Sequence, residues 1–291
     1  VTPLWGAARV PVLSKRLRMT QRRKQTRPHR PRFRKNRHPS RPPQRSDETG
    51  MKYAILGDIH ANWEALSAVL ADAEEQGATH FCSVGDVVGY NADPERCLEK
   101  VQELCGDDVV RGNHDHYCSR EDNLNGFHPL AADVVDWTRK RLDASQREWL
   151  GNLRYSRTVA TFLLVHATLD NPHMWGYVFD KLEAEANFAY QMNSVCFFGH
   201  THVPLAFEKA GIVRSGLYTK LKITAGRKYY INVGSVGQPR DGDPRAAYVI
   251  YDMVQNVVEL RRVSYDIKGA QDKILAAGLP ARAASRLEIG R

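Results

Sequence analysis

Five short apolar runs in this chain each end directly before a polar motif, at residues 53–56, 81–84, 109–110, 161–165 and 195–198. Short apolar runs bounded by Gly and polar residues are typical of buried strands, and several stretches between them have helical periodicity. Alternating strands and helices indicate a parallel sheet, and ligands gather at the carboxyl edge of such a sheet. We therefore expect an α/β fold in which the five polar motifs meet at strand ends.

The motifs supply side chains that are suited to binding metal ions. The candidate ligands are Asp58, His60, Asp86, Asn113, His166, His200 and His202. Mixed oxygen and nitrogen donors suit borderline or hard divalent ions, and no cysteine belongs to the set. With this many imidazoles, Mn²⁺, Fe or Zn²⁺ is favoured over Mg²⁺.

In chain order the motifs read D-x-H, G-D, G-N-H-D, H and G-H-x-H, which resembles the signature of the calcineurin-like metallophosphoesterases. The resemblance covers about 240 residues from Met51 onward. Segments 89–94, 232–241 and 243–248 resemble a bacterial and archaeal branch of uncharacterised phosphoesterases. The resemblance implies a four-layer α/β/β/α sandwich, with a first sheet from the N-terminal βαβ half and a second from the C-terminal strands.

The resemblance also implies a role for each candidate ligand. One ion would be held by Asp58, His60 and His202, and the other by Asn113, His166 and His200, with Asp86 bridging the two. Two ions about 3.5–4 Å apart can share a bridging hydroxide that attacks phosphorus in line. Since His200 and His202 are two residues apart, we expect them to share one side of an extended chain and to enter the same site.

The resemblance assigns His114 as the general acid. Protein phosphatases of the superfamily carry G-D-x-x-D-R-G, in which the second Asp orients this histidine, but Gly89 occupies that position here. Either another group orients His114, Asp115 being too close in sequence to be an obvious candidate, or the histidine is less well poised. Close kinship with eukaryotic Ser/Thr phosphatases is therefore not expected.

Two further residues are candidates for substrate binding, and each has a second interpretation. Arg111 would hold a phosphoryl oxygen or pair with a carboxylate, and Asn62 would touch substrate or cap a helix. The aromatic residues of segment 170–177 would line a leaving-group pocket or pack a loop. Segment 232–240, with Asn232 and Arg240, reads as a polar turn whose glycines also permit close approach to the site.

Helix and strand signals place the remaining elements. Helices are expected after Asn62, from Pro94, and over 129–153, where two helices split near Asp143 form a cap-like insertion beside the metal edge. Strands are expected at 204–208, 228–233, 245–252 and 256–263, followed by a helix over 267–277.

The basic charge of the chain comes entirely from residues 1–50, which hold 15 Lys and Arg against two acids and seven of the 14 prolines. Residues 51–291 hold 27 Lys and Arg against 31 Asp and Glu. We interpret residues 1–50 as a disordered basic extension, either translated upstream sequence or a dispensable segment, and residues 51–291 as one metallophosphoesterase domain. A nucleic-acid partner is expected only if the extension belongs to the native protein.

These observations predict a dinuclear-metal phosphoesterase that hydrolyses a phosphate mono- or diester of a small molecule. A nuclease of the same superfamily and a non-catalytic metal-bound adaptor are the alternatives. No apolar stretch is long enough to span a membrane. The five cysteines lack C-x-x-C spacing, and the cytoplasm is the expected compartment.

Overall fold

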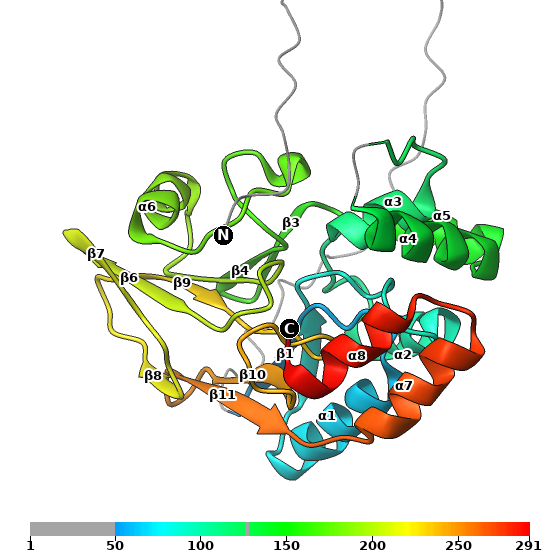
Figure 1. The fold of residues 1–291 in the computed structure, drawn as a ribbon. Helices are drawn as coiled ribbons and strands as arrows, with labels where there is room; N and C mark the ends of the chain where they lie inside the picture. The colour runs from blue at the N-terminus through cyan, green and yellow to red at the C-terminus, as the bar shows by residue number, and fades with distance from the viewer. Residues whose placement is uncertain (1–49, 126–127) are drawn as a thin grey trace, which may run out of the picture. The chain divides into compact units, whose positions relative to one another are not determined.

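Two β-sheets carry the fold in the computed structural model, which describes residues 50–125 and 128–291 (Figure 1). The predicted extension over residues 1–50 therefore lies outside the described residues except for Gly50. The described residues belong to one compact unit, Glu48–Arg291.

The first sheet has five strands in the order β2-β1-β10-β11-β8. Their bounds are β1 Lys52–Leu56, β2 His80–Ser83, β8 Lys220–Lys222, β10 Ala246–Asp252 and β11 Val257–Val263. β1 and β2 run parallel, whereas β10 pairs antiparallel with β1 on its other side. The ends of β1 and β2 therefore lie side by side, which brings the first two predicted motifs together.

The second sheet has six strands in the order β3-β4-β5-β9-β6-β7. Their bounds are β3 Ser156–Val159, β4 Phe162–Val165, β5 Val195–Phe198, β6 Ala206–Ala210, β7 Ile212–Gly216 and β9 Lys228–Asn232. β4, β5 and β9 run parallel, so their carboxyl ends share one edge. The predicted run at 109–110 forms only isolated bridges, to Ser83 and Arg154, and no strand.

The first sheet joins β1 and β2 to the C-terminal strands β10 and β11, and the second sheet includes the parallel strands β4 and β5, so the expected division into a βαβ sheet and a C-terminal sheet was wrong. β10 adds beside β1 in the first sheet, and β9 inserts between β5 and β6 in the second. Apolar patterning tells which face of a strand is buried, but it does not tell which strand will pair with it.

Within the described residues the chain forms eight α-helices and one short 3₁₀ turn. Their bounds are α1 Trp63–Glu75, α2 Pro94–Cys105, α3 Asn113–Ser119, α4 Pro129–Arg141, α5 Ala144–Asn152, α6 Lys181–Tyr190, α7 Ile267–Ala276, α8 Ala281–Ile289 and the turn Pro172–Met174. Asn62 caps α1, as one of its two interpretations predicts, and Asp143, near which the two helices of the insertion were expected to split, caps α5. No helix in the described ranges is both long and apolar enough to cross a membrane.

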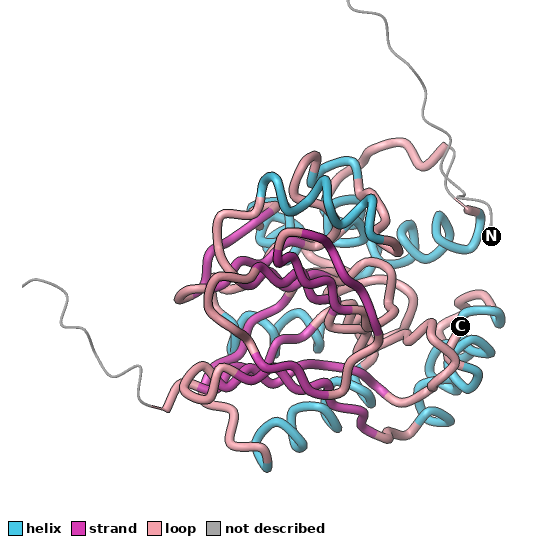
Figure 2. Tube along the Cα trace, turned by 90° about the vertical axis from the view of Figure 1, so that its left-hand side faces the viewer, coloured by secondary structure: helices cyan, strands magenta, loops and turns pink. Residues whose placement is uncertain are grey.

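The two sheets pack face to face, and helices cover their outer faces (Figure 2). Ile55 and Val249 of the first sheet meet Phe197 and Ile231 of the second in a shared core. A second core joins the opposite face of the first sheet to α1 and α2, and a third joins the far face of the second sheet to α6. The predicted four-layer α/β/β/α sandwich is therefore confirmed.

The helices of the predicted insertion, α4 and α5, pack against α3 (Figure 1). α3 begins at Asn113 and was not predicted, because seven residues are too few for a clear helical period. α3 supplies both Asn113 and His114 to the strand-end region, so the insertion supports one wall of that region. Its role as a cap over the substrate stays a prediction.

Candidate metal centre

The loops that follow β1, β2 and β5 are joined by hydrogen bonds at the carboxyl edge of the two sheets. The Asp58 amide donates to the carbonyl of Gly85 at 3.0 Å, and the His60 amide donates to the carbonyl of Asp86 at 2.9 Å. Across the sheets, the His200 amide donates to the Asp58 carboxylate at 3.1 Å. These bonds hold loops from distant parts of the chain in one place.

A first cluster of donors contains Asp58, His60 and His202, with Asp86 at its border. His202 Nε2 lies 3.2 Å from Asp58 Oδ1 and 3.1 Å from His60 Nε2. His60 Nε2 in turn lies 3.5 Å from Asp86 Oδ2. All four side chains are buried.

A second cluster lies on the other side of Asp86. His166 Nε2 is 3.4 Å from Asp86 Oδ2, 3.0 Å from Asn113 Oδ1 and 3.2 Å from His200 Nδ1. His200 Nδ1 is also 3.0 Å from Asn113 Oδ1. The structure thus brings all seven predicted ligands together, and one carboxylate oxygen of Asp86 borders both clusters.

Each of the four histidines is oriented by a main-chain carbonyl outside the clusters. The pairs are His60 Nδ1 with Val88 O at 3.0 Å, His166 Nδ1 with Val84 O at 2.9 Å, His202 Nδ1 with Gln238 O at 2.5 Å, and His200 Nε2 with Trp175 O at 2.9 Å. A carbonyl only accepts hydrogen bonds, so that ring nitrogen carries the proton and the other nitrogen of a neutral ring directs a lone pair into the cluster.

The protonation states of these side chains determine whether the clusters favour a bound cation. Burial lowers the pKa of His60, His200 and His202, so these rings are neutral at pH 7. Burial also acts to lower the pKa of His166, but Asp86, Asp58 and the Val84 carbonyl together outweigh it and raise that pKa to about 9. The unprotonated nitrogens of His60 and His202 lie 3.1 Å apart, and His200 Nδ1 lies 3.0 Å from Asn113 Oδ1; acceptor atoms this close repel one another unless a cation lies between them. The donor set fits divalent ions that accept imidazole and carboxylate together.

Five of the seven predicted ligands have a left-handed backbone. Their φ angles are 50° at Asp58, 50° at His60, 53° at Asp86, 67° at His200 and 59° at His202. The expectation that His200 and His202 lie on an extended chain was therefore wrong. β5 ends at Phe198, and the loop turns at both histidines so that they reach different clusters. Positive φ is unfavourable for residues with a Cβ, and such strain concentrates at functional sites.

Asp115 is an important residue that sequence reasoning did not assign. Its buried carboxylate accepts hydrogen bonds from the amides of Asp86, Val87, Val88 and Gly112, at 2.8–3.3 Å. The carboxylate therefore fixes the turn that carries Asp86. Gly112 belongs to the same packing, because a Cβ at this position would lie 2.1 Å from Asp86 Oδ1.

The segment after β9 is more than a plain turn. The side-chain Nδ2 of Asn232 donates to the carbonyl of Gly199, and Ser235 Oγ donates to the carbonyl of Asp58. A Cβ on Gly237 would lie 1.9 Å from the carbonyl oxygen of Ile59, so only glycine fits this close approach. The segment therefore supports the loops of both clusters. Its glycines, which permit close approach of the backbone, were the sequence signal for this role.

His114 lies beside the first cluster. Its ring centroid is 4.8 Å from that of His60 and 4.5 Å from that of Tyr90, and its amide donates to Asp86 Oδ1 at 2.8 Å. Gly89 packs directly on the ring, since a Cβ there would lie 2.5 Å from His114 Nδ1. In the part of the chain that the structure describes, the buried Nδ1 of His114 has no hydrogen-bond partner, so none of the carboxylates there replaces the Asp that orients this histidine in the protein phosphatases. Burial lowers the pKa of His114 to about 4.

The two candidate substrate contacts have mainly internal partners. Asn62 is fully buried, accepts from the Ala65 amide at 3.0 Å and donates to the Gly237 carbonyl at 3.0 Å, which favours the capping interpretation. Arg111 donates to the carbonyl of Gly151, and its guanidinium carbon lies 5.0 Å from the Tyr155 ring centroid. Among the described residues, Arg111 forms no ion pair with a carboxylate, so the interpretation that it pairs with one is not supported.

The aromatic segment after β4 covers the second cluster. Tyr177 lies 4.4 Å from the His200 ring, and Trp175 lies 6.0 Å from the His166 ring, between ring centroids. The Trp175 carbonyl also fixes His200. The segment therefore packs against two candidate ligands, His166 and His200, and its role in a leaving-group pocket stays a prediction.

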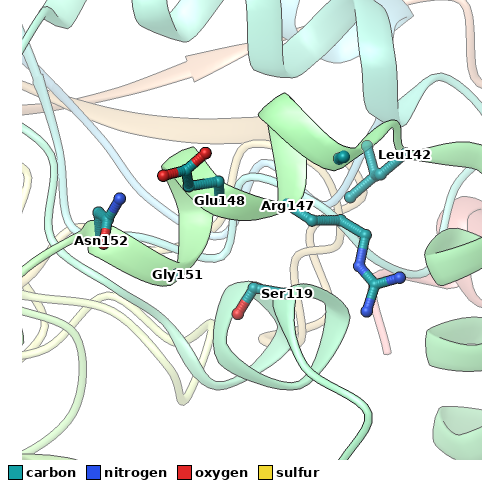
Figure 3. Close-up of a pocket in the computed structure, with 7 residues that line it drawn as sticks. Ser119, Leu142, Arg147, Glu148, Gly151 and Asn152 are labelled. Carbon is teal, nitrogen blue, oxygen red and sulfur yellow. The ribbon is translucent and has the colours of Figure 1, made fainter.

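A pocket of about 440 Å³ lies away from these clusters, between α3 and α5 (Figure 3). It is lined by Ser119, Leu142, Ala144, Arg147, Glu148, Gly151 and Asn152. None of these is a predicted ligand. One lining residue, Gly151, accepts a hydrogen bond from Arg111 at its main-chain carbonyl.

Comparison with known proteins establishes the class that this fold and site define. Residues 51–256 match the family described as the calcineurin-like phosphoesterase superfamily domain. The chain belongs to this superfamily, as its motif order predicted. Membership implies phosphoester hydrolysis and divalent metal ions, for which the two clusters are the candidate ligands.

Individual relatives agree with this assignment. An uncharacterised protein of Methanocaldococcus jannaschii is 35% identical over 244 residues, which cover 82% of this chain and 98% of that protein. The phosphodiesterase YfcE of Escherichia coli is 25% identical over 219 residues, covering 72% of this chain and 92% of YfcE. The crystal structure of a metallophosphoesterase from Sphaerobacter thermophilus has a TM-score of 0.74 and 36% identity, covering 83% of this chain and 100% of that one.

Metal affinity should depend on pH through His166. Because the pKa of this ring is raised to about 9, the ring is protonated at pH 7 and a bound ion must displace that proton. The protonated fraction of the ring falls as pH rises toward 9, so less proton has to be displaced. We expect the affinity for Mn²⁺ to rise about tenfold per pH unit between pH 6 and 8, with release of about one proton per centre. Calorimetry in buffers of different ionisation enthalpy measures that proton, and affinity that is flat with pH would contradict the prediction.

Removal of the Asp115 carboxylate should loosen the Asp86 turn. Asp115→Asn leaves one acceptor oxygen for four buried amide donors, so we expect a loss of about 1–3 kcal/mol in unfolding free energy and weaker metal retention. The control is Asp107→Asn, whose side chain is 92% exposed. Urea unfolding measures the free energy of unfolding of both variants, and metal analysis measures their metal content. Equal stability and metal content in both variants would exclude the anchoring role.

Proposed function

We propose that this protein is a dinuclear-metal-dependent phosphoesterase that hydrolyses a phosphate mono- or diester of a small molecule. The observation that carries the proposal is the pair of donor clusters on either side of Asp86. Asp58, His60 and His202 would hold one ion, and Asn113, His166 and His200 the other. Asp86 would serve both ions, since one of its oxygens borders both clusters.

The metal ions and the protein contribute different parts of the chemistry. When bound, divalent ions stabilise charge on phosphoryl oxygens and lower the pKa of water, so that a nucleophile exists at neutral pH. The protein orients the donors through main-chain carbonyls and thereby preorganises the centre. Mn²⁺, Fe or Zn²⁺ suits the four imidazoles and the two carboxylates.

His114 is the proposed general acid. Burial makes its ring neutral at pH 7 in the absence of substrate. A phosphate anion within about 4–6 Å would raise this pKa and favour the protonated ring. His114 would then donate a proton to the departing oxygen.

The charge of residues 51–291 supports a small substrate. Acids exceed bases in this part of the chain, whereas a nucleic-acid groove requires clustered positive charge. The relative named phosphodiesterase YfcE supports ester hydrolysis of this kind. We also propose the cytoplasm as the compartment, supported by five buried, unpaired cysteines.

Loss of the shared carboxylate or of one imidazole should abolish hydrolysis. We expect Asp86→Asn and His200→Ala to reduce kcat for p-nitrophenyl phosphate or bis-p-nitrophenyl phosphate at least a hundredfold in Mn²⁺. His80→Ala, an exposed histidine outside the site, is the matched control. Removal of metal from the wild-type protein by a chelator should abolish hydrolysis, and addition of Mn²⁺ should restore it.

Three results would redirect the proposal. Near-wild-type rates in Asp86→Asn with metal present would exclude the assigned site. No turnover of either ester by wild-type protein that holds two ions would favour an adaptor. Digestion of DNA by the chain from Met51 onward would favour the nuclease alternative.

A general acid matters most when the leaving group is poor. We therefore expect His114→Gln to reduce kcat about 10²–10⁴-fold for phenyl phosphate and much less for p-nitrophenyl phosphate, whose leaving group needs less protonation. Steady-state kinetics of both esters measure this ratio. Equal losses for the two esters would instead indicate that His114 only binds the phosphoryl group.

A further inference from the structure

Arg240 lies beside the first donor cluster and is held there by its surroundings. Its amide donates to the His202 carbonyl at 3.3 Å. Its guanidinium donates to Gln238 Oε1 from Nη2 at 2.8 Å and from Nε at 3.3 Å. The guanidinium carbon lies 5.5 Å from the Tyr90 ring centroid. Arg240 is partly exposed to solvent.

Gln238 and Tyr90 connect Arg240 to the centre. Gln238 is fully buried, and its main-chain carbonyl fixes His202 while its side-chain oxygen fixes Arg240. The Tyr90 ring lies 4.7 Å from the His60 ring and 4.5 Å from the His114 ring. The guanidinium is thus preorganised next to a candidate ligand and the proposed general acid.

No carboxylate in the described ranges forms an ion pair with Arg240. The two acids that follow it in sequence are already engaged, because Asp241 pairs with Arg262 and Asp243 pairs with Arg245 at 2.7 Å. Arg245 and Arg262 are therefore neutralised by these carboxylates, and Arg240 is not. Its only side-chain acceptor among the hydrogen bonds of the described residues is the neutral amide of Gln238.

The positive charge of Arg240 acts on the centre itself. Burial lowers the pKa of His202, and the Arg240 charge adds to that effect. Asp58 and Asp86 are the only carboxylates among the seven predicted ligands, so two divalent ions would leave the centre positive. A further cation held there is unfavourable unless an anion shares the site.

We propose that Arg240, positioned by Gln238 and Tyr90, binds a phosphoryl oxygen of the substrate and favours dianionic phosphate monoesters over monoanionic diesters. This rests on the proposed phosphoesterase function. A guanidinium donates two parallel hydrogen bonds to phosphate oxygens, and a monoester offers one more terminal oxygen and one more charge than a diester.

The test compares Arg240→Gln and Arg240→Lys with Arg245→Gln, a surface arginine paired with Asp243. In full-length, Mn²⁺-loaded protein we expect Arg240→Gln to keep its metal content and to weaken binding of inorganic phosphate roughly tenfold or more by calorimetry. KM for p-nitrophenyl phosphate should rise by a similar factor, with a smaller rise for bis-p-nitrophenyl phosphate. Arg240→Lys should recover part of the loss, and Arg245→Gln should match wild type.

The possible outcomes separate this inference from the proposed function. Equal phosphate affinity in Arg240→Gln and wild type would overturn the subsite, whatever the activity. Loss of metal in proportion to activity, or equal loss for both esters, would overturn the role in substrate selection in favour of structural support. If wild type hydrolyses neither ester but binds phosphate in an Arg240-dependent way, the anion subsite stands and the proposed hydrolysis fails.

Discussion

The centre depends on main-chain carbonyls that each fix one buried imidazole. Because each carbonyl oxygen accepts a hydrogen bond from one ring nitrogen, the other nitrogen faces the donor clusters, and in the neutral rings of His60, His200 and His202 it directs a lone pair into them. The carbonyls belong to the strand-end loops of both sheets, so the arrangement exists only when the sheets are packed together. The same packing that buries the inter-sheet core therefore also orients the donor atoms of the clusters.

This arrangement stores backbone strain at the ligands. Asp58, Asp86 and His200 all have positive φ, which a short loop needs in order to turn a side chain back over the end of its strand. The cost is offset by hydrogen bonds between loops, such as those that Asp115 accepts from the Asp86 turn. Divalent ions would offset it further, since they bind the folded arrangement and not the unfolded chain.

Much of the site could be predicted, because an apolar run followed by a polar motif locates a strand end without knowledge of the tertiary structure. Six of the seven candidate ligands lie together for this reason, whereas Asn113 follows a run that forms only isolated bridges and begins α3. The role of all seven as ligands stays a prediction. The division of strands between sheets was wrong, since pairing of β9 and β10 joins segments distant in sequence. Asp115 and Arg240 were not assigned, because their partners are main-chain amides and loops that only the folded structure brings near.

The central claim is that two divalent ions lie on either side of Asp86. The most direct measurement is an anomalous-scattering map from crystals of the protein grown with Mn²⁺. The account predicts two peaks about 3.5–4 Å apart, one beside His60 and His202 and the other beside His166 and His200. A single peak, or two peaks that do not share Asp86, would contradict it.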